Sequence, residues 1–177
     1  GYLSSAREII RKIADTEKIL YLYDFLYEGG VADHYTFVFS SMPEQNLIPA
    51  IDHLFKKGDR KFYILATDYN YGILSCEYAK HHIQELGGDV VTTEYVPDKK
   101  QNFSVSIENI LEYSPDAIIS FLVGEMQSDF FAQWYEKGDH RINMISTAAI
   151  PQGHLHMTSA PGRLENFYFS VPYTEEI

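Results

Sequence analysis

Apolar residues along the chain follow two patterns that alternate from one end to the other. Segments with apolar residues three or four positions apart predict helices that bury one face. Short runs rich in Val, Ile, Tyr and Phe predict strands. The predicted helices cover about 5–14, 41–58, 76–86, 103–111 and 130–138. The predicted strands are 18–23, 36–40, 62–67, 89–96, 117–123, 143–147 and 166–171.

Two of the predicted helices begin with a Ser that is followed three residues later by Glu, at Ser5 with Glu8 and at Ser41 with Glu44. This spacing is typical of a capping box, in which both side chains bond free amides of the first turn. Ile9, Ile10 and Ile13 then give the first helix an apolar stripe, and we expect that stripe to be its buried face.

Strands that alternate with helices predict an α/β fold with a mostly parallel sheet that is flanked by helices on both faces. In such sheets ligands bind beyond the carboxyl ends of the strands. We therefore expect the loops 68–71 and 124–126 to lie next to each other at one edge of the sheet. Cys76 falls on the apolar stripe of its helix, so we expect it to be a buried core residue.

Candidate ligand-binding residues follow directly after these predicted strands. They are Tyr23, Tyr69, Tyr71, Gly124 and Glu125. A tyrosine offers a ring that buries a ligand and a hydroxyl that orients it, which suits a small polar molecule. The alternative is that each tyrosine covers a strand end as an ordinary amphipathic residue.

Ser4 stands just before the first helix, where its hydroxyl has two possible roles. It either caps the helix or joins the free amides in holding a carbonyl or carboxylate oxygen. Asp68 and Glu125 also have two possible roles. They are either acid and base groups or loop residues that meet solvent or a cation.

Composition and motifs narrow the function further. A formal charge of −11 disfavours nucleic acid as a partner, because such binding depends on Lys and Arg contacts to phosphates. The longest apolar stretch, 117–123, is too short to span a bilayer. The seven histidines match no established metal-ligand spacing, and no phosphate loop, dinucleotide fingerprint or nucleophile elbow occurs. We therefore predict a binding module without a metal or another cofactor.

Five short motifs carry a resemblance that spans nearly the whole chain. They are Tyr2-Leu3-Ser4-Ser5-Ala6-Arg7, Tyr27-Glu28-Gly29, Gln45-Asn46 with Pro49, Thr67-Asp68-Tyr69-Asn70-Tyr71 and Val123-Gly124. Together they resemble the amide- and urea-binding branch of the type I periplasmic binding proteins, which is related to branched-chain amino-acid receptors. The resemblance implies a two-lobed protein that captures a small ligand between its lobes.

The same resemblance assigns roles to particular residues. Ser4, Tyr23, Tyr69 and Tyr71 stand where relatives hold the ligand, and Gly124 gives close access to the backbone. Two segments depart from the relatives. Asp24-Phe25-Leu26 replaces Pro-Thr-Pro, and Ala148-Ala149 stands where relatives carry Thr residues. Because these changes replace hydroxyls with apolar groups, acetamide or urea would lack partners in the pocket.

The family layout predicts how the chain divides. Residues 1–41 would be part of the first lobe, 42–171 the second lobe, and 172–177 a hinge return toward the first lobe. A lobe represented only in part would leave apolar edges uncovered, so we expect this chain to self-associate.

The function implied is that of a ligand-binding component of an ABC transporter or a sensor, not an enzyme. Its expected partners are a small polar ligand such as an amide, urea or amino acid, and a membrane permease or signalling domain. Its expected location is periplasmic or extracytoplasmic, with a cytoplasmic sensor as the other possibility. The alternatives are a small-amide hydrolase that uses Asp68, Glu125 or Cys76, and a flavodoxin-like signalling domain.

Overall fold

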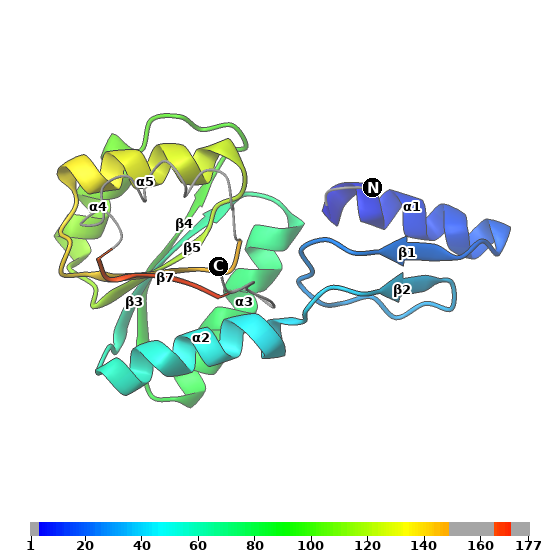
Figure 1. Ribbon diagram of the computed structural model, residues 1–177, viewed down its shortest axis with the longest axis horizontal. Helices are drawn as coiled ribbons and strands as arrows, with labels where there is room; N and C mark the ends of the chain where they lie inside the picture. Colours follow the sequence, from blue (N-terminus) through cyan, green and yellow to red (C-terminus); the bar gives the residue numbers. More distant parts are fainter. Residues whose placement is uncertain (1–3, 149–164, 171–177) are drawn as a thin grey trace, which may run out of the picture.

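The computed structural model describes residues 4–148 and 165–170. It confirms the α/β fold with parallel sheets, which is laid out in Figure 1. The helices are α1 (Ser4–Glu17), α2 (Pro43–Lys57), α3 (Asn70–Glu85), α4 (Ser104–Tyr113) and α5 (Glu125–Lys137). The strands are β1 (Tyr21–Tyr23), β2 (Thr36–Val38), β3 (Lys61–Thr67), β4 (Asp89–Val96), β5 (Ala117–Phe121), β6 (Asn143–Ser146) and β7 (Phe167–Phe169).

The larger sheet has the strand order β4-β3-β5-β6-β7, and every pair in it is parallel. Helices α2 and α3 cover one face and α4 and α5 the other (Figure 1). Strands β3 and β5 are central and almost entirely buried because both of their faces meet helices. Cys76 is fully buried in the core between α3 and the sheet, which confirms the prediction for it.

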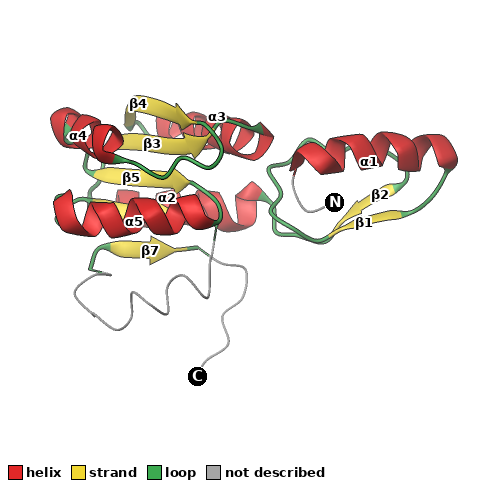
Figure 2. Ribbon diagram, turned by 90° about the horizontal axis from the view of Figure 1, so that it is seen from above, coloured by secondary structure: helices red, strands yellow, loops and turns green. Residues whose placement is uncertain are grey.

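A smaller unit precedes this sheet in the chain. Strands β1 and β2 form a parallel pair, and α1 packs on one side of the pair. Figure 2 shows that the unit lies beyond the carboxyl ends of β3, β4 and β5, the ends toward which their arrows point. The described segment that connects β2 to α2 therefore passes the edge at which a ligand site is expected.

Helices α3 and α5 begin at Asn70 and Glu125, six and five residues before the predicted starts, whereas the two predicted capping serines lie close to the observed helix starts. Helix α1 begins at Ser4, so Ser5 lies inside the helix, and the Glu8 carboxylate accepts hydrogen bonds from Arg7 and Arg11. Helix α2 is capped at Met42, whose backbone N–H donates to Oε1 of Gln45 at 2.8 Å. The capping pattern thus identified the region correctly and the residue wrongly.

The prediction for the buried face of α1 is wrong. Ile9 and Ile13 are 64% and 56% exposed, whereas Ser4, Arg7 and Ala14 are buried. The helix turns this polar side toward the neighbouring loop because Arg7 forms a buried ion pair there. Ile9 and Ile13 are therefore exposed, whereas Ile10 of the same stripe is half-buried.

Several predicted strands are shorter in the structure. The strand predicted over 18–23 is formed only by Tyr21–Tyr23, because Lys18 adopts a left-handed conformation with φ of 55° that interrupts extended backbone. The strand predicted over 143–147 ends at Ser146, whose Oγ accepts a hydrogen bond from the Ala148 N–H at 3.2 Å. Within the described residues, no helix is long and apolar enough to cross a membrane.

Candidate functional site

The two loops expected to be neighbours lie side by side in the structure. Strand β3 pairs in parallel with β5, so the loops that follow Thr67 and Phe121 leave the sheet at the same edge. Tyr69 from the first loop and Gly124 from the second line one cavity. The topology therefore places these candidate residues together, as predicted.

This cavity, which we call the loop cavity, has a volume of about 370 Å³. Carboxylates and lysines line it together with the Tyr69 ring. Its lining residues are Ser5, Tyr69, Asp98, Lys99, Lys100, Gln101, Val123, Gly124, Glu125, Met126 and Asp129. Its size falls at the lower end of the range for small-molecule sites.

A second cavity of about 320 Å³ lies between the β1–β2 loop, the segment that connects β2 to α2, and the first turns of α2 and α3. We call it the connector cavity. Its lining residues are Asp24, Phe25, Leu26, Tyr27, Phe39, Ser40, Ser41, Pro43, Asn46, Leu47, Tyr71, Ser75 and Thr147. It differs from the loop cavity in carrying mostly apolar and hydroxyl side chains.

Tyr71 contributes to the connector cavity from the first turn of α3. Its hydroxyl lies 3.0 Å from Oγ1 of Thr147, and both side chains are buried. Burial raises the pKa of Tyr71 to about 12, so the hydroxyl keeps its proton at neutral pH. Thr147 was not among the sequence candidates, because nothing in the sequence signals contact with a residue 76 positions earlier.

Gly72 allows the turn that places Tyr71. A Cβ atom at position 72 would lie 2.0 Å from the backbone oxygen of Thr67, far inside van der Waals contact. Only glycine therefore permits α3 to begin so close to the end of β3.

Tyr69 lies on the loop side of the same turn and is half-buried. Burial raises its pKa, and the nearby Tyr71 hydroxyl raises it further. The centroids of the two rings are 6.3 Å apart. The hydroxyl of Tyr69 is therefore a neutral hydrogen-bonding group at the wall of the loop cavity.

Gly124 and Glu125 stand at the start of α5, and both are exposed along the loop cavity. Gly124 has a φ of 70°, a conformation that favours glycine. Its carbonyl accepts a hydrogen bond from the Gln127 N–H at 3.2 Å. The Glu125 side chain therefore lines the cavity next to the exposed backbone of Gly124.

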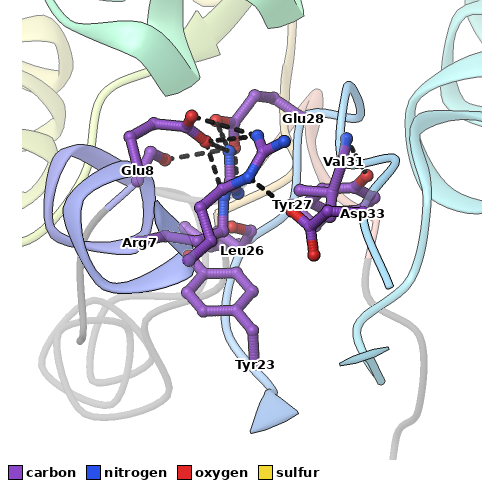
Figure 3. Close-up of polar contacts among 10 residues, drawn as sticks. Arg7, Glu8, Tyr23, Leu26, Tyr27, Glu28, Val31 and Asp33 are labelled. Carbon is purple, nitrogen blue, oxygen red and sulfur yellow. Dashed lines mark hydrogen bonds and ion pairs between the residues drawn. The ribbon is translucent and has the colours of Figure 1, made fainter. Parts of the chain in front are cut away.

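Ser4 and Tyr23 are placed differently, because neither lines the loop cavity or the connector cavity. The Ser4 hydroxyl donates to Oε2 of Glu28 at 3.1 Å, and the Tyr23 hydroxyl donates to the backbone oxygen of Leu26 at 2.9 Å. Both residues are buried. In this structure the two side chains belong to an internal network, which is drawn in Figure 3.

Arg7 and Glu28 form the centre of that network (Figure 3). Nη2 of Arg7 lies 2.5 Å from Oε1 of Glu28, and Nη1 donates to Oε2 at 3.2 Å. The guanidinium carbon is 5.0 Å from the Tyr23 ring centroid and 5.1 Å from that of Tyr27. Burial alone would lower the pKa of Arg7, but the Glu28 carboxylate outweighs it and the pKa is raised.

The network ties α1 to the loop between β1 and β2. A buried pair with two parallel hydrogen bonds fixes geometry more firmly than a single contact does. Both Arg7 and Glu28 occur in the motifs that carry the family resemblance, yet no sequence pattern predicts that they pair. Within the described residues, no cluster of three or more His, Cys, Asp and Glu side chains could hold a metal ion.

A parallel sheet with helices on both faces and cavities beyond its carboxyl edge defines an α/β ligand-binding domain. Residues 1–159 match the family model described as "Periplasmic binding protein domain", and the chain belongs to this family. The predicted resemblance to type I periplasmic binding proteins is thereby confirmed. A search of curated proteins found no match.

Solved structures give the same fold. An amino acid ABC transporter substrate-binding protein from Pseudomonas fluorescens Pf-5 is 20% identical with a TM-score of 0.79, covering 98% of this chain and 48% of that one. A solute binding protein of an ABC transporter from R. palustris, in complex with 4-hydroxybenzoate, is 27% identical with a TM-score of 0.60, covering 64% of this chain and 32% of that one.

A fatty acid ABC transporter substrate-binding protein from Thermomonospora curvata is 15% identical with a TM-score of 0.74, covering 90% of this chain and 42% of that one. The chain thus spans about half or less of the length of these structures.

Proposed function

We propose that this chain is part of a substrate-binding protein of an ABC transporter, which captures a small molecule between two lobes and delivers it to a membrane permease. The observation that carries the proposal is the loop cavity, where Tyr69, Gly124 and Glu125 meet at the carboxyl edge of the sheet, on the side of the small unit. Family membership supports the same function and an extracytoplasmic location.

The proposed ligand is a small organic molecule with at least one polar group. Three similar proteins are described as binding proteins for amino acids and fatty acids or were solved with 4-hydroxybenzoate. Our narrower proposal is that the polar group of the ligand is an amide or a urea group. It rests on the motifs that resemble the amide- and urea-binding branch, because residues of these motifs line both cavities.

The proposed division of the chain assigns 1–41 to the first lobe, 42–171 to the second and 172–177 to a return toward the first. The small unit supports this division, because Leu22 and Phe37 are paired neighbours in its sheet and are 61% and 48% exposed. Such a bare apolar face suits further βα units of the complete gene product. Residues 171–177 lie outside the described residues.

We propose binding without catalysis. Of the groups considered for a hydrolase, Cys76 is fully buried, and burial raises the pKa of its thiol to about 12. A thiol in that state supplies almost no thiolate nucleophile at neutral pH. Asp68 and Glu125 are exposed, which suits solvated loop residues.

The test is a ligand screen by calorimetry on the complete gene product, with small-angle scattering to follow lobe closure. We expect one class of small molecule to bind and to reduce the radius of gyration. Tyr69→Ala should weaken binding at least about tenfold, because it removes the ring that covers the loop cavity. Tyr113→Ala is the control, since this half-exposed residue lies on α4 away from both cavities. Turnover of the ligand, or binding that is indifferent to Tyr69→Ala, would contradict the proposal.

A further inference from the structure

The connector cavity has a wall chemistry that differs from that of the loop cavity. Phe25, Leu26, Phe39 and Leu47 supply apolar side chains from three different segments. Among the described residues that line it, the only charged side chain is the exposed Asp24, and none is Lys or Arg. The apolar part of a ligand would therefore find a large contact area in this cavity. An anion would find no positive charge among these lining residues.

The polar part of this cavity is the pair of hydroxyls on Tyr71 and Thr147. They lie 3.0 Å apart, and either oxygen is able to donate to the other. The pair has two hydroxyl protons and uses one of them between its own oxygens. One proton therefore remains for a third group, which makes the pair a donor toward an acceptor atom.

The charge state of the pair is fixed near neutral pH. Burial raises the pKa of Tyr71 to about 12, and a threonine hydroxyl does not ionise in this range. Both residues are more than nine-tenths buried, with Tyr71 4% and Thr147 6% exposed. A carboxylate placed here would lose its hydration and gain only a neutral donor, whereas a neutral carbonyl oxygen would lose far less.

Resting on the proposed function, we propose that the connector cavity selects the ligand: it binds an uncharged molecule whose apolar body packs on Phe25 and Leu47 and whose acceptor oxygen bonds the Tyr71 and Thr147 hydroxyls. Carboxylates of the same shape are rejected for want of a cation. Ammonium compounds are rejected because they would lose their hydration without gaining a buried counter-charge, since the exposed carboxylate of Asp24 is screened by water.

The experiment compares three probes that share one ring and differ in charge, namely benzamide, benzoate and benzylammonium. Calorimetry on the complete gene product at pH 7 should give the tightest binding for benzamide, by about tenfold or more. Tyr71→Phe and Thr147→Val each remove one hydroxyl and keep the shape. Each should weaken benzamide by about tenfold and leave the weak binding of benzoate nearly unchanged.

Matched controls come from the opposite face of the sheet, where Tyr113 and Thr93 stand near each other around a separate hollow. Tyr113→Phe and Thr93→Val should change no affinity. Thermal unfolding of every variant separates a lost hydrogen bond from a lost fold, and Phe25→Thr is a further variant that alters the apolar wall alone. Phe25→Thr should weaken benzamide without reversing the order of the probes.

Equal or tighter binding of benzoate or benzylammonium would overturn the inference, and so would benzamide binding that survives both hydroxyl deletions. Failure of all three probes would also overturn it. The proposed function is judged separately by the wider screen. Binding of some other ligand that depends on Tyr69 and not on Tyr71 would leave that function standing.

Discussion

The Arg7 guanidinium lies 2.5 Å from the Glu28 carboxylate, and the two side chains are almost completely buried. Arg7 belongs to α1, whereas Glu28 belongs to the loop between β1 and β2. The Ser4 hydroxyl donates to the same carboxylate. The buried Glu28 carboxylate thus holds the first turns of α1 against the β1–β2 loop. The same unit leaves the apolar side chains of Leu22 and Phe37 exposed.

We expect Glu28→Gln to destabilise the chain by about 3 kcal/mol, because it leaves the buried Arg7 charge with only the half-buried Glu8 carboxylate at 3.3 Å as a counter-charge. Urea unfolding at pH 7 measures the change. Glu77→Gln is the control, since its surface ion pair with Lys80 at 3.1 Å should be worth less than about 1 kcal/mol. Equal effects of the two substitutions would show that the buried pair has no special weight.

Gly72→Ala should destabilise the chain more than a glycine substitution elsewhere. The added Cβ would lie 2.0 Å from the Thr67 backbone oxygen, so the start of α3 must move away from the end of β3. We expect a loss of at least about 3 kcal/mol and a displaced Tyr71. Gly58→Ala is the comparison, because its site is open and only its φ of 109° opposes a side chain, at about 1 kcal/mol. The reverse order in urea unfolding would contradict this account of the turn.

The sequence predicted the parts of the site that depend on topology. Alternating strands and helices imply a parallel sheet, and the parallel pairing of β3 and β5 brings Tyr69 and Gly124 to one edge. The pairing of Tyr71 with Thr147 could not be predicted in the same way. It depends on side-chain directions at the ends of two strands, and periodicity carries no information about these.

The errors at α1 have a different physical origin. Ile9 and Ile13 have the spacing of a buried stripe, and sequence periodicity predicts burial wherever that spacing occurs. Burial of α1 is instead decided by Arg7, which pairs with a carboxylate 21 positions away. A long-range ion pair leaves no periodic signal, so the exposed and buried faces of this helix were exchanged.

Stability should fall as pH rises from about 10 to about 12, in part because of Tyr71. The ordinary tyrosine pKa of 10.0 applies to the unfolded chain, whereas burial raises the pKa of Tyr71 in the folded chain to about 12. Between these values the unfolded state has released a proton that the folded state still holds, so rising pH favours unfolding. Tyr71→Phe should make the dependence less steep, and Tyr113→Phe should not change it. Urea unfolding at pH 8, 10 and 11 gives the comparison, and identical slopes for wild type and Tyr71→Phe would contradict it.

The last prediction concerns the bare face of the small unit. Leu22 and Phe37 are register partners on β1 and β2 and are 61% and 48% exposed, with Phe39 close by at 69%. An apolar face beside unpaired strand edges favours association between copies of a chain.

We therefore expect the 177-residue chain to self-associate at micromolar concentrations in sedimentation velocity. The double substitution Leu22→Lys with Phe37→Lys should return the chain to a monomer. Two lysines on that face would repel the same face of a second copy and would be hydrated. Leu111→Lys on α4 is the control, since Leu111 is 38% exposed on the far side of the larger sheet and should leave association unchanged. A monomeric wild-type chain, or association that survives the double substitution, would show that this face is not the contact between copies.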